Sequence, residues 1–92
     1  MDSALPGADL IDRGLSDLEE GVVSVEALLV SIGAPRLRRV GIPVDTFINE
    51  PERKLYDLLA AEHTDSAHSR YNALIRRLVS FERAAECVNP RT

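Results

Sequence analysis

Apolar residues recur along residues 9–32 at alternating steps of four and three positions. The members of this stripe are Ile11, Leu15, Leu18, Val22, Val25, Leu29 and Ile32. Such spacing keeps apolar side chains on one face of an α-helix, and here it crosses Gly21 without a change of phase. Asp9 is a suitable N-cap, and Gly33 followed by Pro35 is a typical helix stop. The pattern therefore predicts one helix of about 24 residues, roughly 36 Å long.

Residues 21–25 also permit a second interpretation. Their sequence, GVVSV, is rich in β-branched residues, so the alternative is a helix that ends at Glu20 and continues as a strand. The continuous helix is favoured because the apolar stripe keeps its helical phase, whereas the alternation typical of a strand is not kept.

Residues 33–50 predict a turn followed by an ordered loop. A single helical turn fits residues 35–41, which begin with proline and end with glycine. The next stretch, IPVDTFINE, predicts extended or irregular chain, because residues before proline avoid the α region. Four apolar side chains are expected to hold this loop against the core: Ile42, Val44, Phe47 and Ile48.

The C-terminal half predicts a shorter helix and a second long helix. Pro51 suits a first helical position, with Asn49 or Glu50 as its cap, and opens a helix over residues 51–63. A second stripe with four-three spacing occupies Ala67, Tyr71, Leu74, Leu78, Phe81, Ala85 and Val88. We expect this last helix to end at residues 89–90, which are Asn and Pro.

One continuous helix over residues 51–88 is the alternative for this half, since neither glycine nor proline interrupts it. However, the apolar stripe changes phase between Glu62 and Ala67. The residues at 64–66, TDS, are all N-cap types. A turn is therefore predicted there.

These elements together predict an all-α fold, a small up-down bundle of three main helices. Two long helices run parallel to each other, the shorter one runs antiparallel to both, and a short helical turn follows the first. We expect a single helical domain over residues 1–92, with residues 1–8 and 89–92 as flexible ends.

Charged residues flank the two stripes in a way that favours parallel packing of the long helices. Asp12, Glu19 and Glu26 form an acidic row at heptad position e, and Arg70 and Arg77 occupy g positions beside the second stripe. In parallel coiled coils, g faces e of the neighbouring helix. The alternative is that these charges lie on solvated faces and repeat by chance.

The first predicted helix also carries features of an association surface. Gly14 and Gly21 lie seven residues apart on one edge, and each costs about 1 kcal/mol relative to alanine, which indicates close approach of another backbone. The alternative is neutral variation at the surface, or fraying near the N-terminus for Gly14. Its second half is apolar on more than one face and therefore needs cover on several sides. The predicted association interface comprises Gly14, Leu18, Gly21, Val22, Val25 and Leu29. We expect a homo-oligomer, with a dimer favoured, or a partner protein helix; the pattern does not separate pairing within the chain from pairing between chains.

The length and composition of the chain indicate how many domains it forms and in which compartment it resides. The chain has 92 residues, which is room for one domain, and its core must be aliphatic because it holds two Phe, two Tyr and no Trp. A single cysteine, Cys87, cannot form an intramolecular disulfide and fits a reducing compartment. The N-terminus lacks the regions of a signal peptide, and residues 22–32 are too short and too polar to span a bilayer. These features predict a cytoplasmic protein without a membrane segment.

Five arginines define a candidate basic surface. Arg36, Arg38 and Arg39 follow the first predicted helix, while Arg76 and Arg83 occupy the outermost position of the last one. Cations are favoured near a helix C-terminus, which explains the first three without a ligand. The alternative function is a small nucleic-acid-associated or regulatory protein that uses this surface. Nucleic-acid binding is disfavoured by the net charge of −4.

No arrangement of residues indicates catalysis, a metal or a cofactor. Glu62, His63, Asp65 and His68 are metal-ligand types, but the histidines are separated by a predicted turn instead of sharing one helix face. Cys87 lies near a helix C-terminus, where the dipole disfavours a thiolate, and the chain lacks a glycine-rich phosphate loop. We therefore expect a non-enzymatic helical interaction module that self-associates or docks a partner helix; an accessory subunit of an enzyme is a third interpretation.

Overall fold

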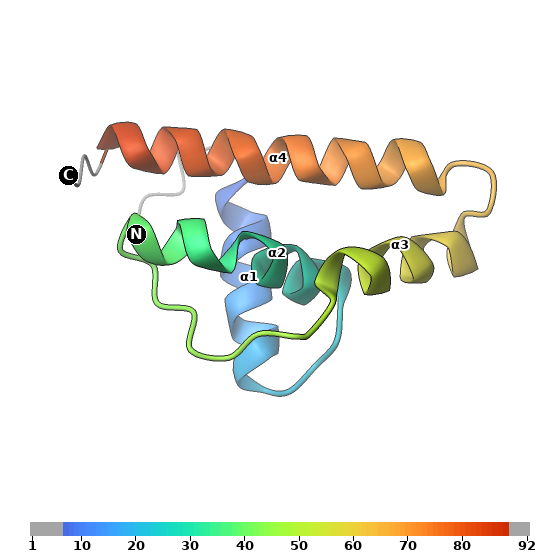
Figure 1. Ribbon diagram of the computed structural model, residues 1–92, viewed down its shortest axis with the longest axis horizontal. Coiled ribbons are helices and arrows are strands. Elements are labelled where there is room, and N and C mark those ends of the chain that lie inside the picture. Colours follow the sequence, from blue (N-terminus) through green and yellow to red (C-terminus); the bar gives the residue numbers. More distant parts are fainter. Residues whose placement is uncertain (1–6, 89–92) are drawn as a thin grey trace.

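The computed structural model describes residues 7–88, which fold into four α-helices (Figure 1). The helices are α1 (Ala8–Glu19), α2 (Val25–Arg39), α3 (Pro51–Glu62) and α4 (Ala67–Val88). The all-α class is confirmed, and the alternative strand at 21–25 is wrong, since the described part of the chain contains no strand. The prediction of three main helices is wrong because the first predicted helix is divided into α1 and α2.

The break between α1 and α2 is made by Gly21, which adopts a left-handed conformation with φ of 74°. The N–H of Gly21 donates to the Leu18 carbonyl (3.1 Å), and the N–H of Val22 donates to the Asp17 carbonyl (2.8 Å). These two bonds form a Schellman motif, which satisfies the last carbonyls of α1 and turns the chain away. Ser24 then caps α2. The apolar stripe keeps its phase across the break, so its period alone did not reveal a helix end.

The predicted stop at Gly33 is wrong, because α2 continues through Gly33 and Pro35 to Arg39. The region expected to be turn and loop, 33–50, is therefore helical over 33–39, and the single turn expected at 35–41 is the end of α2. The stop is Gly41, with φ of 92°, where a second Schellman motif joins the Ile42 N–H to the Leu37 carbonyl at 3.0 Å.

Gly33 is accommodated inside α2 because α4 passes close to it. A Cβ atom at Gly33 would lie 2.8 Å from Glu82 Oε2 and 2.9 Å from Leu78 Cδ1. The absence of a side chain thus allows α2 and α4 to pack closely, and this tertiary contact outweighs the low helix propensity of glycine.

The predicted ends of the chain lie mostly outside the described residues, which exclude 1–6 and 89–92. Ala8, expected in a flexible end, instead opens α1 and is buried in the core. The N-cap of α1 is Gly7, not Asp9, which lies in the first turn of the helix. At the other end, the predicted turn at 64–66 is confirmed between α3 and α4.

The helices are arranged around α2. In Figure 1, α2 and α4 run in the same direction, α3 runs the opposite way, and α1 crosses behind α2 with its N-terminal end near α4. The crossing of α1 and α2 is close because Gly14 faces the Glu26 carbonyl and Val30, where a Cβ atom would overlap both. The second backbone predicted to approach Gly14 is therefore α2 of the same chain.

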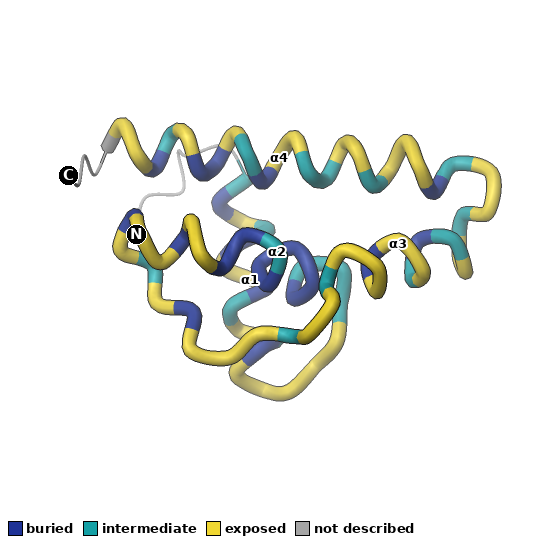
Figure 2. The backbone as a smooth tube through the Cα atoms, viewed as in Figure 1, coloured by how far each residue is buried: buried dark blue, intermediate teal, exposed yellow. Residues whose placement is uncertain are grey.

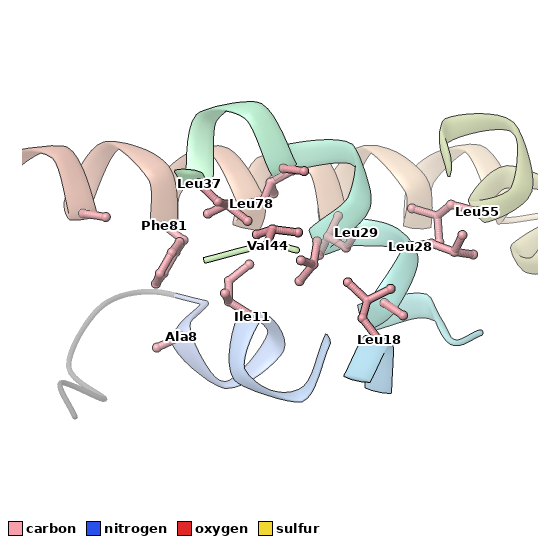
Figure 3. Packing of buried hydrophobic residues seen from close by; sticks show 14 of the residues in the cluster. Ala8, Ile11, Leu18, Leu28, Leu29, Leu37, Val44, Leu55, Leu78 and Phe81 are labelled. Carbon is pink, nitrogen blue, oxygen red and sulfur yellow. The ribbon is translucent and has the colours of Figure 1, made fainter. Parts of the chain in front are cut away.

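The core is aliphatic, as the composition predicts, and α2 is its centre. Figure 2 shows the buried positions concentrated on α2, and Figure 3 shows side chains from all four helices meeting there. Residues with at most 2% exposure include Ile11, Leu28, Leu29, Val30, Leu37, Val44 and Leu55. Full burial of such a side chain contributes about 1.5–3 kcal/mol, so this cluster is the main source of stability.

The loop from 42 to 48 is attached to the core. Three of the four apolar residues expected to hold it there do so. Val44 is buried, and Ile42 and Ile48 pack against the core cluster. The Ile48 N–H also donates to the Ser31 hydroxyl at 3.0 Å. Phe47 departs from the expectation, because half of it is exposed and its ring lies under the Arg38 guanidinium, 5.3 Å from the centroid.

Candidate docking cleft between α2, α3 and α4

The structure divides the six residues predicted to form an association interface. Gly14, Leu18 and Leu29 are buried by the chain's own helices. Gly21 and Val22 are exposed in the turn between α1 and α2. Only Val25, at the start of α2, is half-buried beside a cleft that is open to solvent. The apolar excess seen in the sequence is thus covered largely within the chain.

This cleft has a volume of about 400 Å³ and lies where the N-terminus of α2, the C-terminus of α3 and the first half of α4 meet. Its apolar residues are Val25, Leu59, Ala73 and Leu74. Leu59 is buried, Val25 and Leu74 are half-buried, and Ala73 is exposed. The sequence did not reveal this site because Leu74 is an ordinary member of the second stripe and Leu59 an ordinary apolar residue of the predicted helix over 51–63. Only the crossing of three helices leaves them at an opening.

The two sides of the cleft carry opposite charges. Arg70 and Arg77 stand on the α4 side, while Glu26 of α2 and Glu62 of α3 stand on the other. Within residues 7–88, no ion pair joins either glutamate to either arginine. The charges are therefore separated across an apolar floor, with Glu62, Arg70 and Arg77 exposed and Glu26 half-buried.

The contacts that these charged groups do make are weak. Arg77 Nη2 lies 3.6 Å from Asp9 Oδ1, and both side chains are more than half exposed. Arg70 Nε donates to the Ser66 hydroxyl at 3.1 Å. Glu62 Oε1 lies 3.8 Å from Nε2 of His63, its neighbour in the chain. Exposed ion pairs of this kind contribute about 0–1 kcal/mol, so they do not hold the charges in place strongly.

Glu62 and Arg70 stand at helix ends that disfavour their charge. Glu62 is the last residue of α3, where the negative end of the helix dipole favours cations. Arg70 lies in the first turn of α4, where the dipole favours anions. Neither charged residue therefore stabilises the helix in which it lies through the helix dipole.

The predicted acidic row forms no ion pair with Arg70 or Arg77 within residues 7–88, and only Glu26 of that row lies at the same cleft as the two arginines. Glu26 shares the cleft with Arg70 and Arg77, as their heptad positions indicated. Asp12 and Glu19 instead lie on exposed positions of α1, because the chain turns at Gly21 and the acidic row is divided between two helices.

The candidate basic surface is partly neutralised by acidic neighbours. Arg36 Nη1 lies 3.7 Å from Glu82 Oε1, and Arg36 Nε lies 3.6 Å from Glu86 Oε2. Glu82 is buried between α2 and α4, and burial raises the pKa of its carboxyl, with Arg36 lowering it and Glu86 raising it. The charge of Arg36 is therefore partly neutralised within the chain, which argues against a role for this residue in binding an anionic ligand.

The remaining four arginines of that set are exposed. Arg38 is engaged locally, since its Nε donates to the Val44 carbonyl at 2.9 Å and its guanidinium stacks on Phe47. A smaller cavity of about 220 Å³ adjoins this pair. Arg39, Arg76 and Arg83 make no ion pair with any residue in 7–88.

The metal-ligand types at residues 62–68 do not converge in the structure. Across residues 7–88, no group of three or more His, Cys, Asp and Glu side chains is placed to hold a metal ion. Cys87 is exposed on α4. Within the same residues, no helix combines the length and the apolar character needed to cross a bilayer. Comparison with protein-family models, with curated proteins and with solved structures finds no match to this chain.

Proposed function

We propose that this chain is a non-enzymatic helical interaction module whose docking surface is the cleft between α2, α3 and α4. One observation carries the proposal: three helices leave an apolar floor open to solvent, with charged residues on both sides of it. An apolar centre with a polar rim is the usual composition of a protein–protein interface.

The shape of the cleft favours a helix as its occupant. On α4, the lining residues Arg70, Ala73, Leu74 and Arg77 follow the spacing of one helix face over two turns. Ala73 is small, so the backbone of a docking helix can approach α4 closely there. Amphipathic helices commonly bind in such grooves through apolar anchors spaced at three and four residues.

The non-enzymatic part of the proposal rests on where the titratable groups lie. Glu82, the carboxyl group whose pKa is raised, faces Gly33 and Arg36 between two helices, outside the cleft. The ionisable groups that line the cleft are exposed or half-buried, so they lack the desolvation that general acid–base chemistry requires. A cytoplasmic location is also part of the proposal, because the single cysteine fits a reducing compartment.

A photo-crosslinking amino acid placed at Ala73 tests the proposal in living cells. We expect irradiation to produce protein adducts, because a docked helix would lie against this position. The matched control is the same amino acid at Asn72, which is exposed on α4 outside the cleft. A Leu74→Arg substitution, which puts a charge in the floor, should remove the adducts. Equal adducts at both positions, or none at Ala73, would contradict the proposed function.

A further inference from the structure

We infer that the occupant of the cleft is a second copy of this chain, docked face to face about a two-fold axis that runs along the cleft. This inference rests on the proposed function and names its partner. It follows from the distribution of charge across the cleft, from the symmetry rules of dimers, and from the helix ends at which Glu62 and Arg70 stand.

The cleft is self-complementary in charge. Its α4 side is basic, through Arg70 and Arg77, and its other side is acidic, through Glu26 and Glu62. In a two-fold dimer the same surface meets itself, so a contact between residues i and j occurs twice. An axis along the cleft places the basic side of each copy opposite the acidic side of the other. An axis across the cleft would place like charges together, and the charges therefore select one of the two arrangements.

A symmetric contact also accounts for the positions of Glu62 and Arg70. Each charge is disfavoured by the dipole of its own helix, and neither is paired with the other within the described chain. In the proposed dimer, Glu62 of each copy faces Arg70 of the other. Charges that are unfavourable in the single chain thereby become favourable at the contact, where partial burial strengthens their attraction.

The apolar floor matches itself in the same arrangement. Residues near a two-fold axis meet their own copies, so Val25, Ala73 and Leu74 of one chain would meet apolar residues of the other. Ala73 is exposed and small, which permits α4 of one copy to approach α2 and α3 of the other. The net charge of −4 on each chain opposes association at long range, so the local pairing of opposite charges is needed to orient the copies.

Two charge reversals test the inference without weakening the helices. Glu62→Lys puts a cation at the C-terminus of α3, and Arg70→Glu puts an anion in the first turn of α4, so each change suits the local dipole. At protein concentrations low enough for every chain to be monomeric, thermal unfolding of both variants is therefore expected to match or exceed that of the unmodified chain. Asp57→Lys and Arg76→Glu are the controls, because they make the same changes in net charge at exposed positions outside the cleft.

Sedimentation equilibrium over a hundredfold range of concentration measures the effect. The unmodified chain and both controls should form a dimer. Each reversal alone should weaken dimerisation about tenfold or more, since two symmetric contacts become repulsive. An equimolar mixture of the Glu62→Lys and Arg70→Glu chains should restore dimerisation as a heterodimer, and the double variant should restore it as a homodimer.

Three results would overturn the inference. These are a monomer at all concentrations, a dimer that is insensitive to both reversals, and a dimer weakened by the reversals but not restored by mixing. A monomeric chain that still crosslinks at Ala73 to a different protein would retain the proposed function and reject self-association. Failure of the crosslinking contrast between Ala73 and Asn72 would instead reject the cleft as a docking surface.

Discussion

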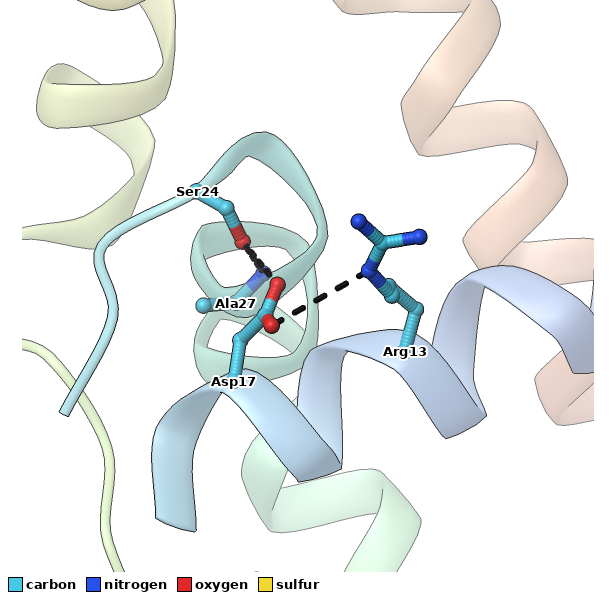
Figure 4. A network of polar contacts seen from close by, with 4 residues as sticks. All are labelled: Arg13, Asp17, Ser24 and Ala27. Carbon is cyan, nitrogen blue, oxygen red and sulfur yellow. Dashed lines mark hydrogen bonds and ion pairs between the residues drawn. The ribbon is translucent and has the colours of Figure 1, made fainter. Parts of the chain in front are cut away.

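The Ser24 hydroxyl donates a 2.6 Å hydrogen bond to Asp17 Oδ2 and thereby joins the start of α2 to the end of α1 (Figure 4). The same hydroxyl oxygen accepts the Ala27 N–H at 3.1 Å, so one side chain both caps α2 and fixes the turn that precedes it. Arg13 Nε lies 4.0 Å from Asp17 Oδ1 and adds a weak contact on the other carboxylate oxygen. The angle between α1 and α2 therefore depends on a short polar chain as well as on core packing.

We expect Ser24→Ala to destabilise the fold by about 1–2 kcal/mol, because it removes an N-cap and leaves Asp17 without its donor. Urea unfolding followed by circular dichroism measures this loss. Ser80→Ala, at an exposed position of α4, is the control and should change stability by less than about 0.5 kcal/mol. In a double-mutant cycle with Asp17→Ala, additive effects would show that the hydrogen bond has no role.

Gly14→Ala and Gly33→Ala should differ although both glycines lie inside helices. At Gly14 the added methyl group meets the Glu26 backbone carbonyl, which cannot move without shifting α2. At Gly33 it meets the ends of the Glu82 and Leu78 side chains, which can move. We expect a net loss of about 2 kcal/mol for Gly14→Ala and a change within about 1 kcal/mol for Gly33→Ala, after the gain in helix propensity. Equal unfolding free energies for the two variants would contradict this account of the helix crossings.

Glu82 should make stability depend on pH. Its pKa in the folded chain is raised by burial above the ordinary value of 4.5, so the folded state holds this proton more tightly than the unfolded state does. Stability from this group is therefore fully present below the ordinary pKa and is lost as pH rises through the raised value. Glu82→Gln should flatten this dependence as pH rises above the ordinary value of 4.5. Urea midpoints at a series of pH values measure this slope, with Glu19→Gln, exposed on α1, as the control. If the Glu82→Gln variant kept the slope of the unmodified chain, the assignment to Glu82 would be refuted.

Ser31 attaches the loop at 42–48 to α2, because its buried hydroxyl donates to the Ala27 carbonyl (2.9 Å) and accepts the Ile48 N–H (3.0 Å). We expect Ser31→Ala to cost about 1–3 kcal/mol, since the Ile48 N–H loses its acceptor. Hydrogen exchange gives the local readout: the Ile48 amide should exchange faster, while the amide of Leu59 changes only as much as global stability does. Unchanged protection at Ile48 would show that the loop is held by its other contacts without this hydrogen bond.

Much of the architecture could be predicted from local patterns. The all-α class, the start of α3 at Pro51 and the turn at 64–66 follow from residue types and from a change in the phase of the apolar stripe. These features depend on neighbours in sequence, and such signals are strong for proline at a first helical position and for clustered N-cap residues. The aliphatic core likewise follows from the near absence of aromatic residues.

The roles of the glycines could not be distinguished from the sequence. Gly21 and Gly41 end helices in the left-handed conformation, whereas Gly14 and Gly33 lie inside helices where another helix passes. Glycine is suited both to a positive φ and to the close approach of another backbone. The sequence alone therefore does not show which of the two roles a given glycine has. The cleft between α2, α3 and α4 could not be predicted from the sequence for a related reason. Hydrophobic periodicity identifies which face of a helix is covered but not what covers it, so only the packing of α2, α3 and α4 decided that Leu59 and Leu74 border an open cleft between opposite charges.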